Sequence, residues 1–275
     1  MKVDIKISET HSNFKSKVKL KKSRFRVIKQ IVNYGILPIS ILVLWEILTR
    51  LNVFPPILLP SVEDVVRSFI EQLSSGQLLG DLSVSLIRVL KGYSIAIILG
   101  LSLGVFMGVS LRASKFFTIV FDGIRQVPPM AWIPLLILWF GIGETSKIVM
   151  IAKSAFFPIL LNTINGIRNT PKGYLEVAKM YNIKKRDLFT RVYFPSAVPS
   201  IFVGLRLGAG ASWMAVVAAE LIASDSGIGY RINDARSLMQ PDVVIVGMIV
   251  IGTVGMLMDL ILKRVAKLAS RWQIS

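Results

Sequence analysis

Long runs of apolar residues separated by short charged segments dominate this chain of 275 residues. About 20 mainly apolar residues are enough to cross the hydrocarbon core of a bilayer as a helix. The pattern therefore predicts six membrane-spanning helices, whose ends are defined to within a few residues, at 31–50, 90–110, 116–140, 147–167, 200–223 and 242–262. Pro128 and Pro129 interrupt the third span, because proline cannot donate a backbone hydrogen bond. We expect an all-α integral membrane protein.

The polar stretch between the first two spans contains an amphipathic segment, "LPSVEDVVRSFIEQL". Its apolar residues recur at helical spacing, and Ser61 with Asp64 three residues later is typical of a capping box. These features predict a short helix on the outer surface. Packing as a lid over the spans is favoured over a binding site for a specific partner.

Charge is distributed unevenly between the two sets of loops. The chain has a formal net charge of +17, and 23 of its 33 Lys and Arg residues lie in segments 1–30, 111–115, 168–191 and 263–275. The alternate loops hold only three, in segments 51–82, 141–146 and 224–241. By the positive-inside rule, both termini of this multi-pass chain are expected to face the cytoplasm. Nucleic acid is excluded as a partner, because the positive charge is spread over four segments joined by apolar spans.

The pattern of spans and loops predicts five regions. They are a basic cytoplasmic tail (1–30), a first transmembrane helix (31–50), an external loop with the amphipathic helix (51–82), an apolar core with a polar insert at 170–192 (83–265), and a cytoplasmic C-terminal tail (266–275).

The chain lacks the residues that most enzymes and metal sites require. It has no cysteine, and its one histidine is His11 in the basic tail, so thiolate and histidine metal sites are excluded. "GIGETSK" lacks the Gly-Lys-Ser/Thr ending of a phosphate-binding loop, and "GIGYRI" is not a dinucleotide fingerprint. We expect no catalytic residue, no metal and no cofactor, and therefore a transporter, a channel or a subunit of either.

Ionisable residues within or beside the spans must face protein or water, since a charge in lipid costs several kcal/mol. They are Glu46, Arg88, Lys91, Asp122, Arg125, Lys153, Arg206, Glu220 and Asp259. The candidates for an anion pathway are Arg125, Arg206 and Glu220. The favoured alternative for each is an interhelical ion pair or a head group that snorkels to the membrane surface. Gly100, Gly104 and Gly108 give one smooth helix face, which predicts tight packing within the bundle or, less favoured, a contact between chains.

The insert "EVAKMYNIKKRDLFTRVYFPSAVP" resembles the EAA motif of bacterial ABC-importer permeases, which is Glu-Ala-Ala, three residues, Gly, and nine or so residues to an apolar-Pro pair. This chain has Val177 at the second position and Asn182 at the glycine position. Asn is the non-glycine residue that best tolerates a left-handed backbone, so the turn that glycine would permit is expected to be kept.

The resemblance extends from about residue 40 to 272 and is to the nitrate/sulfonate/taurine branch of that family. It is carried by "LWEIL", "ILLPSVEDV", "SLIRVLKGYSIAIILGLSLGVFMG", "IRQVPPMAWIPLLILWFGIGETSKI", "GLRLGAGASWMAVVAAELIASDSGIGYRINDA" and the terminal "RW". It implies a type I importer permease in the bacterial cytoplasmic membrane. Its partners would be a second copy of the permease, two ATP-binding subunits that hydrolyse ATP, and an extracytoplasmic solute-binding protein.

By this resemblance the insert is a cytoplasmic coupling helix that docks on the ATP-binding subunit. The residues that the motif assigns to coupling are Glu176, Val177, Ala178, Asn182, Asp187, Phe189 and Pro195. Ala178 is expected to be small enough to let the partner's surface come close.

The resemblance predicts a small anion as substrate, with aliphatic sulfonates first and taurine and nitrate next. A thiamine-precursor pyrimidine or another small heterocycle is the alternative within the same branch. A stand-alone secondary transporter or channel is the alternative of a different class, and it would have no ATPase partner.

Overall fold

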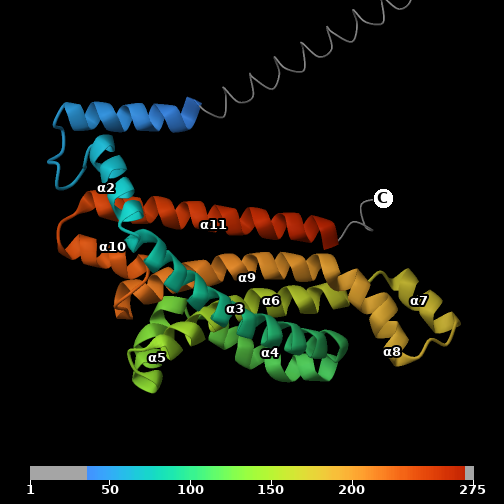
Figure 1. The fold of residues 1–275 in the computed structure, drawn as a ribbon. Helices are drawn as coiled ribbons and strands as arrows, with labels where there is room; N and C mark the ends of the chain where they lie inside the picture. Colours follow the sequence, from blue (N-terminus) through green and yellow to red (C-terminus); the bar gives the residue numbers. More distant parts are fainter. Residues whose placement is uncertain (1–35, 270–275) are drawn as a thin grey trace, which may run out of the picture. The chain divides into compact units, whose positions relative to one another are not determined.

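The computed structural model describes residues 36–269. The chain divides into two compact units, with the boundary in the sequence between Val66 and Arg67. All regular secondary structure in residues 36–269 is helical, as the sequence predicts. Figure 1 shows the order of the helices along the chain. The predicted tail 1–30, with His11, lies outside the described residues, as do residues 270–275.

In the first unit, residues 36–50 form a helix, so the predicted span 31–50 is helical over the part that the structure describes. The indole N–H of Trp45 donates a hydrogen bond of 3.0 Å to the carbonyl of Pro60 and ties this helix to the loop that follows it. One turn apart on the helix, Glu46 and Arg50 form an ion pair of 2.6 Å.

Helix α2 (Val62–Ser74) is the amphipathic helix expected in the external loop. The Ser61 hydroxyl accepts a hydrogen bond from the Asp64 amide (3.1 Å) and donates one to its carboxylate (2.6 Å), so the predicted cap is present. The buried residues are Val65, Ser68 and Gln72, whereas the apolar residues Val66, Phe69, Ile70 and Leu73 are exposed. These four apolar residues of α2 are therefore exposed in the single chain, and the lid stays a prediction.

Four helices of the described part are long and apolar enough to cross a membrane. They are α3 (Gln77–Val109), α6 (Glu144–Arg168), the run Lys185–Ala223 that ends in α9 (Phe194–Ala223), and α11 (Pro241–Ala269). They contain the predicted spans 147–167, 200–223 and 242–262 and nearly all of 90–110.

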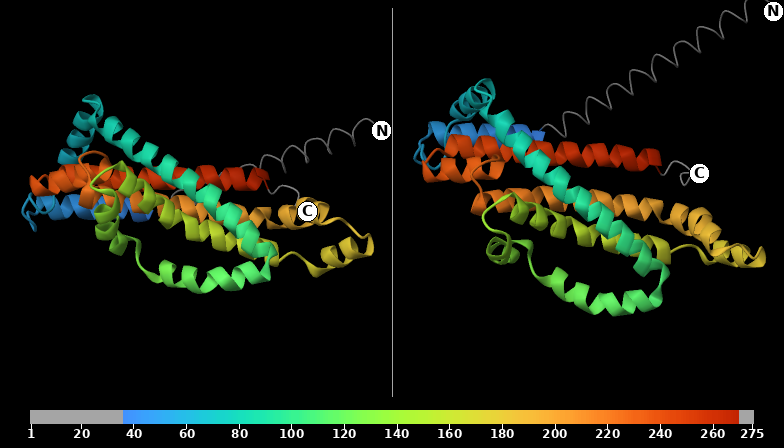
Figure 2. Two further views of the ribbon diagram at one scale, coloured as in Figure 1. Left: turned by 90° about the horizontal axis from the view of Figure 1, so that it is seen from below. Right: turned by 60° about the horizontal axis from the view of Figure 1, so that its bottom comes forward.

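The predicted span 116–140 is not one helix. It is divided into α4 (Leu111–Gln126), a short 3-10 turn η1 (Pro129–Trp132) and α5 (Ile133–Phe140). Pro128 forces the residue before it away from helical geometry, and Val127 is accordingly extended, with φ −76° and ψ 118°. Figure 2 shows the chain changing direction between α4 and α5.

Helix α6 is the centre of the second unit and packs against both α3 and α9. The contact with α3 runs along small residues: a β-carbon at Gly92 would lie 2.6 Å from a side-chain carbon of Ile151, and one at Gly104 would lie 2.6 Å from the β-carbon of Thr163. Gly100 and Gly108 meet α6 in the same way. The predicted glycine face therefore serves packing within the chain, where small residues let two helix backbones approach closely.

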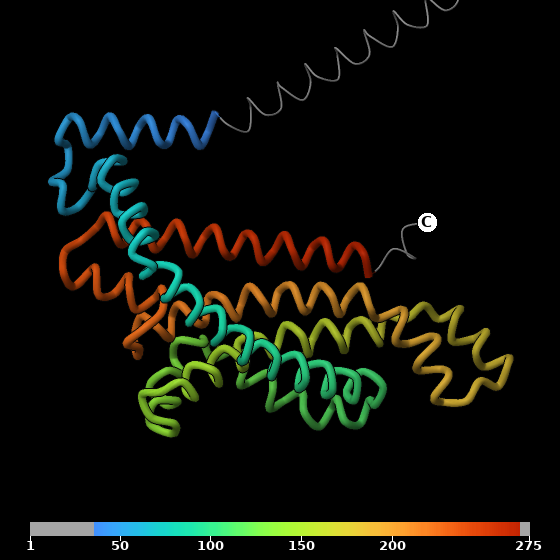
Figure 3. The backbone as a smooth tube through the Cα atoms, in the orientation of Figure 1, coloured from blue at the N-terminus to red at the C-terminus, as the bar shows by residue number. Residues whose placement is uncertain are grey.

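The two ends of the second unit are built differently. Helices α7 (Lys172–Met180) and α8 (Lys185–Leu188) form a hairpin beyond one end of α6 and α9, together with the π-helical turn η2 (Phe189–Tyr193). Helix α10 (Ile228–Ser237) lies at the opposite end and packs against α9 and α11. The backbone tube of Figure 3 shows the hairpin projecting from the bundle.

Candidate functional site

The projecting hairpin contains the residues that the sequence assigns to coupling. Helix α7 follows Pro171, whose fixed φ of −55° suits a helix start. Asn182 then adopts a left-handed conformation with φ +48°, which confirms the predicted turn at this position.

Two backbone hydrogen bonds close this turn. The Asn182 N–H donates to the carbonyl of Lys179 (3.0 Å), and the Ile183 N–H donates to the carbonyl of Ala178 (3.1 Å). This is the bonding of a Schellman motif, in which the residue after the helix cap takes positive φ and the next residue turns back towards the helix. Asn182 thus fills the role that glycine has in the motif.

Helix α8 continues through η2 into α9 without a break in the helical path. The Phe194 N–H donates to the carbonyl of Phe189, five residues earlier, and this marks the π-helical turn. A proline ring clashes with the carbonyl four residues before it in an ordinary helix. A widened turn relieves this clash at Pro195, which gives the π-turn a physical reason.

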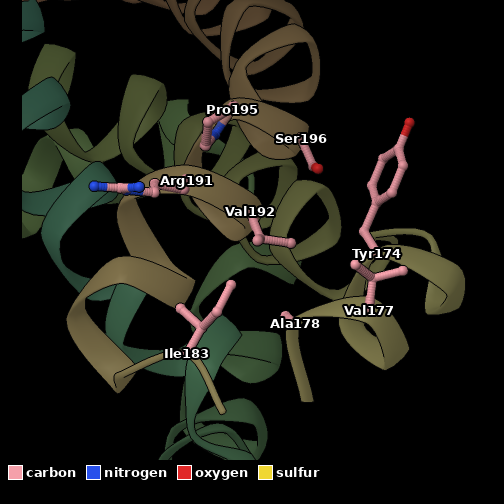
Figure 4. A pocket seen from close by; sticks show the side chains of 8 residues that line it. All are labelled: Tyr174, Val177, Ala178, Ile183, Arg191, Val192, Pro195 and Ser196. Atoms are coloured by element: carbon pink, nitrogen blue, oxygen red, sulfur yellow. The ribbon is translucent and has the colours of Figure 1, made fainter. Parts of the chain in front are cut away.

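A groove of about 410 Å³ lies between α7 and the α8–η2–α9 arm. Figure 4 shows its lining side chains arriving from the two arms and from the turn; they are Tyr174, Val177, Ala178, Ile183, Arg191, Val192, Pro195 and Ser196. Asn182 lines a second hollow of similar volume together with Ala178, Leu188 and Tyr193.

The side chain of Ala178 is only 4% exposed, so within the single chain its small size lets the two arms of the hairpin approach each other. Its expected contact with a partner stays a prediction. The neighbouring residues Val177, Met180 and Tyr181 are 52%, 82% and 78% exposed. The sequence did contain a signal for the last two, since both are large apolar residues beside a turn in an otherwise charged segment.

The other coupling candidates differ in their surroundings. Glu176 is exposed on α7, and Asp187 pairs with Arg191 one turn later at 3.5 Å. The ring of Phe189, the first residue of η2, lies 6.2 Å from that of Phe194, the first residue of α9.

Glu220, one of the three predicted pathway residues, lies in a buried cluster at the opposite end of the unit. The Arg88 guanidinium donates to Glu220 (2.8 Å) and to both carboxylate oxygens of Glu144 (2.5–3.1 Å). The side chains of Arg88 and Glu220 are 2% and 0% exposed, respectively. This geometry favours the interhelical ion pair over a pathway lining for Glu220.

Further donors complete the cluster around Glu220. The Ser85 hydroxyl donates to the carboxylate at 2.8 Å and the Gly229 N–H donates at 3.0 Å. Gly227 has φ +102°, and a β-carbon there would lie 2.4 Å from the Glu220 carboxyl carbon, so only glycine fits. The "GIG" at 227–229 therefore packs against the buried carboxylate of Glu220. The cluster as a whole connects α3, α6, α9 and α10.

The other two pathway candidates are also ion-paired. Arg206 on α9 donates through Nε and Nη2 to both oxygens of Asp259 on α11, at 2.8 Å for the Nη2 bond. Arg125 pairs with Asp122 one turn earlier at 3.2 Å. Both arginines are partly exposed in the single chain, at 42% and 39%, so they can still face a pathway.

Comparison with known proteins gives consistent matches. Residues 79–271 match the family described as binding-protein-dependent transport system inner membrane component. A protein of Escherichia coli (strain K12) named "Putative aliphatic sulfonates transport permease protein SsuC" is 41% identical over 236 residues, which are 86% of this chain and 90% of that protein. The taurine transport system permease protein TauC of the same organism is 30% identical over 257 residues, 91% of this chain and 93% of that protein.

Among solved structures, that of an amino acid ABC transporter aligns with a TM-score of 0.59 at 16% identity. The alignment covers 74% of this chain and 97% of that one, and it supports the fold alone.

Proposed function

This chain belongs to the family of binding-protein-dependent transport system inner membrane components, and we propose that it forms the pathway of an ATP-driven importer for a small anion. The family match and the relatives confirm the resemblance found in the sequence, so the chain is an ABC-importer permease and a membrane component. Permeases of this kind work with an ATP-binding subunit and a substrate-binding protein. In this proposal ATP is hydrolysed on the separate ATP-binding subunit, and two copies of each subunit assemble.

The hairpin α7–α8 is our candidate for the surface that docks on the ATP-binding subunit. The observation that carries this proposal is its geometry: a polar helix leaves the bundle, turns at Asn182 through positive φ and re-enters as one helical path into α9. Such a path transmits a displacement of the hairpin to a membrane-spanning helix. The exposed Met180 and Tyr181 supply apolar contact area at the tip, with Glu176 beside them.

An aliphatic sulfonate is the first candidate for the substrate. It is supported by two relatives that the chain matches over more than four-fifths of its length, one named for aliphatic sulfonates and one for taurine, which is itself a sulfonate. Taurine and nitrate follow as candidates.

We further propose that the hairpin and both termini face the cytoplasm. Support comes from the sequence, since segments 111–115, 168–191 and 263–275 are rich in Lys and Arg, and from the fold, since the α7–α8 hairpin and the C-terminal end of α11 lie at the same end of the second unit.

The orientation predicts the reactivity of engineered cysteines, and the chain has no native cysteine to interfere. In intact cells a cysteine at the exposed Lys184 should resist a membrane-impermeant thiol reagent, whereas one at the exposed Ser75 should react. Both should react after the cells are opened. Labelling of the Lys184→Cys variant in intact cells would reverse the proposed orientation.

The transport function itself is tested by reconstitution. The permease, purified with its ATP-binding subunit and placed in vesicles, should take up radiolabelled ethanesulfonate or taurine only when ATP and the solute-binding protein are both supplied. Uptake of these probes without ATP would indicate a secondary transporter or channel. Uptake of a pyrimidine but of neither sulfonate would overturn the anion assignment and leave the permease assignment intact.

A further inference from the structure

Lys153 lies on α6 directly beside the break between α4 and α5. Its ammonium donates a hydrogen bond of 3.2 Å to the carbonyl of Val127, the extended residue before Pro128. The same ammonium lies 4.6 Å from the ring centroid of Trp132, the last residue of η1. The residue is partly buried, and these two contacts fix the position of its ammonium group.

Lys153 lies too far from either end of α6 to be explained as a lysine that extends its ammonium group to the membrane surface. It is nine residues from the start of α6 at Glu144 and fifteen from its end at Arg168. At a rise of 1.5 Å per residue, these separations are about 14 Å and about 22 Å along the helix axis. A lysine side chain that bonds to Val127 is therefore not extended towards lipid phosphates at either surface, as snorkelling lysines near helix ends are.

The described residues supply no counter-charge for Lys153. Arg88 and Lys147 both pair with Glu144, Arg206 pairs with Asp259, and no carboxylate of residues 36–269 lies within ion-pair distance of Lys153. One carbonyl and one aromatic face compensate only part of the cost, because a cation–π contact contributes about 0.5–2 kcal/mol while a charge deep in a membrane costs several.

A second polar group at the break, the indole N–H of Trp132, has no hydrogen-bond partner among the described residues. This indole nitrogen is buried. An N–H donor and an ammonium group thus lie at the same break, and both are suited to an acceptor that carries negative charge. Non-helical backbone at this depth is tolerated where it is buried in protein or lines a water-filled path.

We propose that Lys153, with the α4–α5 break and the indole N–H of Trp132, forms an anion-binding subsite for the translocated substrate. This inference rests on the proposed transport of a small anion, and it names the residues of this chain that recognise the negative group. The ligand class is a small oxyanion such as a sulfonate. Arg125 and Arg206 are less suited to this role, because each already has a carboxylate partner.

The local potential can be measured without transport. A cysteine at Met130, an exposed residue of η1, is treated with the ethylsulfonate and the ethyltrimethylammonium methanethiosulfonate reagents in the assembled transporter. The ethylsulfonate reagent is itself an aliphatic sulfonate. We expect Lys153→Gln to lower the ratio of the two reaction rates, sulfonate over ammonium, by about tenfold. Met130 lies in the short segment between Val127 and Trp132, which both contact the Lys153 ammonium, and a unit charge acts strongly at the low dielectric of a protein site.

A cysteine at Ile142 is the matched control. Ile142 is exposed and precedes α6 by two residues, so about half the length of α6 separates it from Lys153. Its rate ratio should not change when Lys153 is replaced. An equal rate ratio at Met130→Cys with and without Lys153 would overturn the subsite. The same result is expected if a carboxylate of another subunit neutralises Lys153, and it overturns the subsite in that case too.

Three substitutions separate charge from structure. Lys153→Gln keeps a donor for the Val127 carbonyl but loses the charge, Lys153→Met loses both, and Lys153→Arg keeps both. We expect Gln and Met alike to lower kcat/KM for ethanesulfonate uptake by about tenfold, and Arg to retain most of it. Normal uptake by Lys153→Gln would assign Lys153 a structural role only. If the wild-type transporter takes up no sulfonate, the proposed function fails, and the rate ratio at Met130→Cys still tests the subsite.

Discussion

Replacement of Arg88 by Met is expected to destabilise the permease so strongly that little of it remains folded. Arg88 is buried and donates hydrogen bonds to Glu144 and Glu220 and to the backbone carbonyl and hydroxyl of Ser226. Without it, the Glu220 carboxylate would be a buried charge that keeps only the Ser85 and Gly229 donors. Removing one partner of a buried ion pair costs about 3–5 kcal/mol, which is a large share of the stability of a typical domain.

The measurement is the midpoint of thermal unfolding in detergent, alongside the yield of monodisperse protein. Arg125→Met is the control, since its partly exposed pair with Asp122 should contribute less than about 1 kcal/mol. The double variant Arg88→Met with Glu220→Gln should regain part of the loss, because it removes the unpaired charge. If Arg88→Met unfolds at the same temperature as Arg125→Met, the cluster does not hold the four helices together.

Much of the helix pattern could be predicted from local sequence, since each apolar run carries its own signal. Two features that depend on single residues could also be predicted. Pro128 indicated the break that divides 116–140, and Asn182 indicated a turn with positive φ. The environment of α2 was not predictable in the same way. Its helical period is evident, but Val66 and Phe69 are exposed while Ser68 and Gln72 are buried, so the face it buries is not its most apolar one.

The partners of charged residues could not be predicted from the sequence. Arg88 and Glu220 are 132 positions apart, and nothing local shows that α3 and α9 bring them together. Glu220 therefore could not be distinguished from a pathway residue, and Lys153 was one of nine candidate charges with nothing to set it apart. Ala178 illustrates the same limit, because its small size indicated close packing but not whether the neighbour belongs to this chain or to another.

Asn182→Ile is expected to disconnect the hairpin from its partner with little effect on insertion into the membrane. A β-branched residue at φ +48° is strained by about 1–2 kcal/mol, which favours a turn that releases the hydrogen bonds to Lys179 and Ala178. The tip formed by Met180 and Tyr181 would then be misplaced. Since 1.4 kcal/mol corresponds to a factor of ten, we expect substrate-stimulated ATP hydrolysis to fall about tenfold.

Asn182→Gly is the matched control, because glycine adopts positive φ freely at the end of a helix and should leave hydrolysis nearly unchanged. Glu176→Lys tests the surface rather than the turn. It reverses an exposed charge on α7, and a like-charge contact at an interface can cost several kcal/mol, so it should release the ATP-binding subunit from the permease.

The most direct test of the central claim is substrate-stimulated ATP hydrolysis by the reconstituted transporter, measured together with the amount of ATP-binding subunit that stays bound to the permease. If residues 172–190 couple the two subunits, Asn182→Ile and Glu176→Lys lose stimulated hydrolysis while Asn182→Gly keeps it, and all three insert normally. Full stimulated activity in both Asn182→Ile and Glu176→Lys would contradict the account and reduce the hairpin to a loop between two spans.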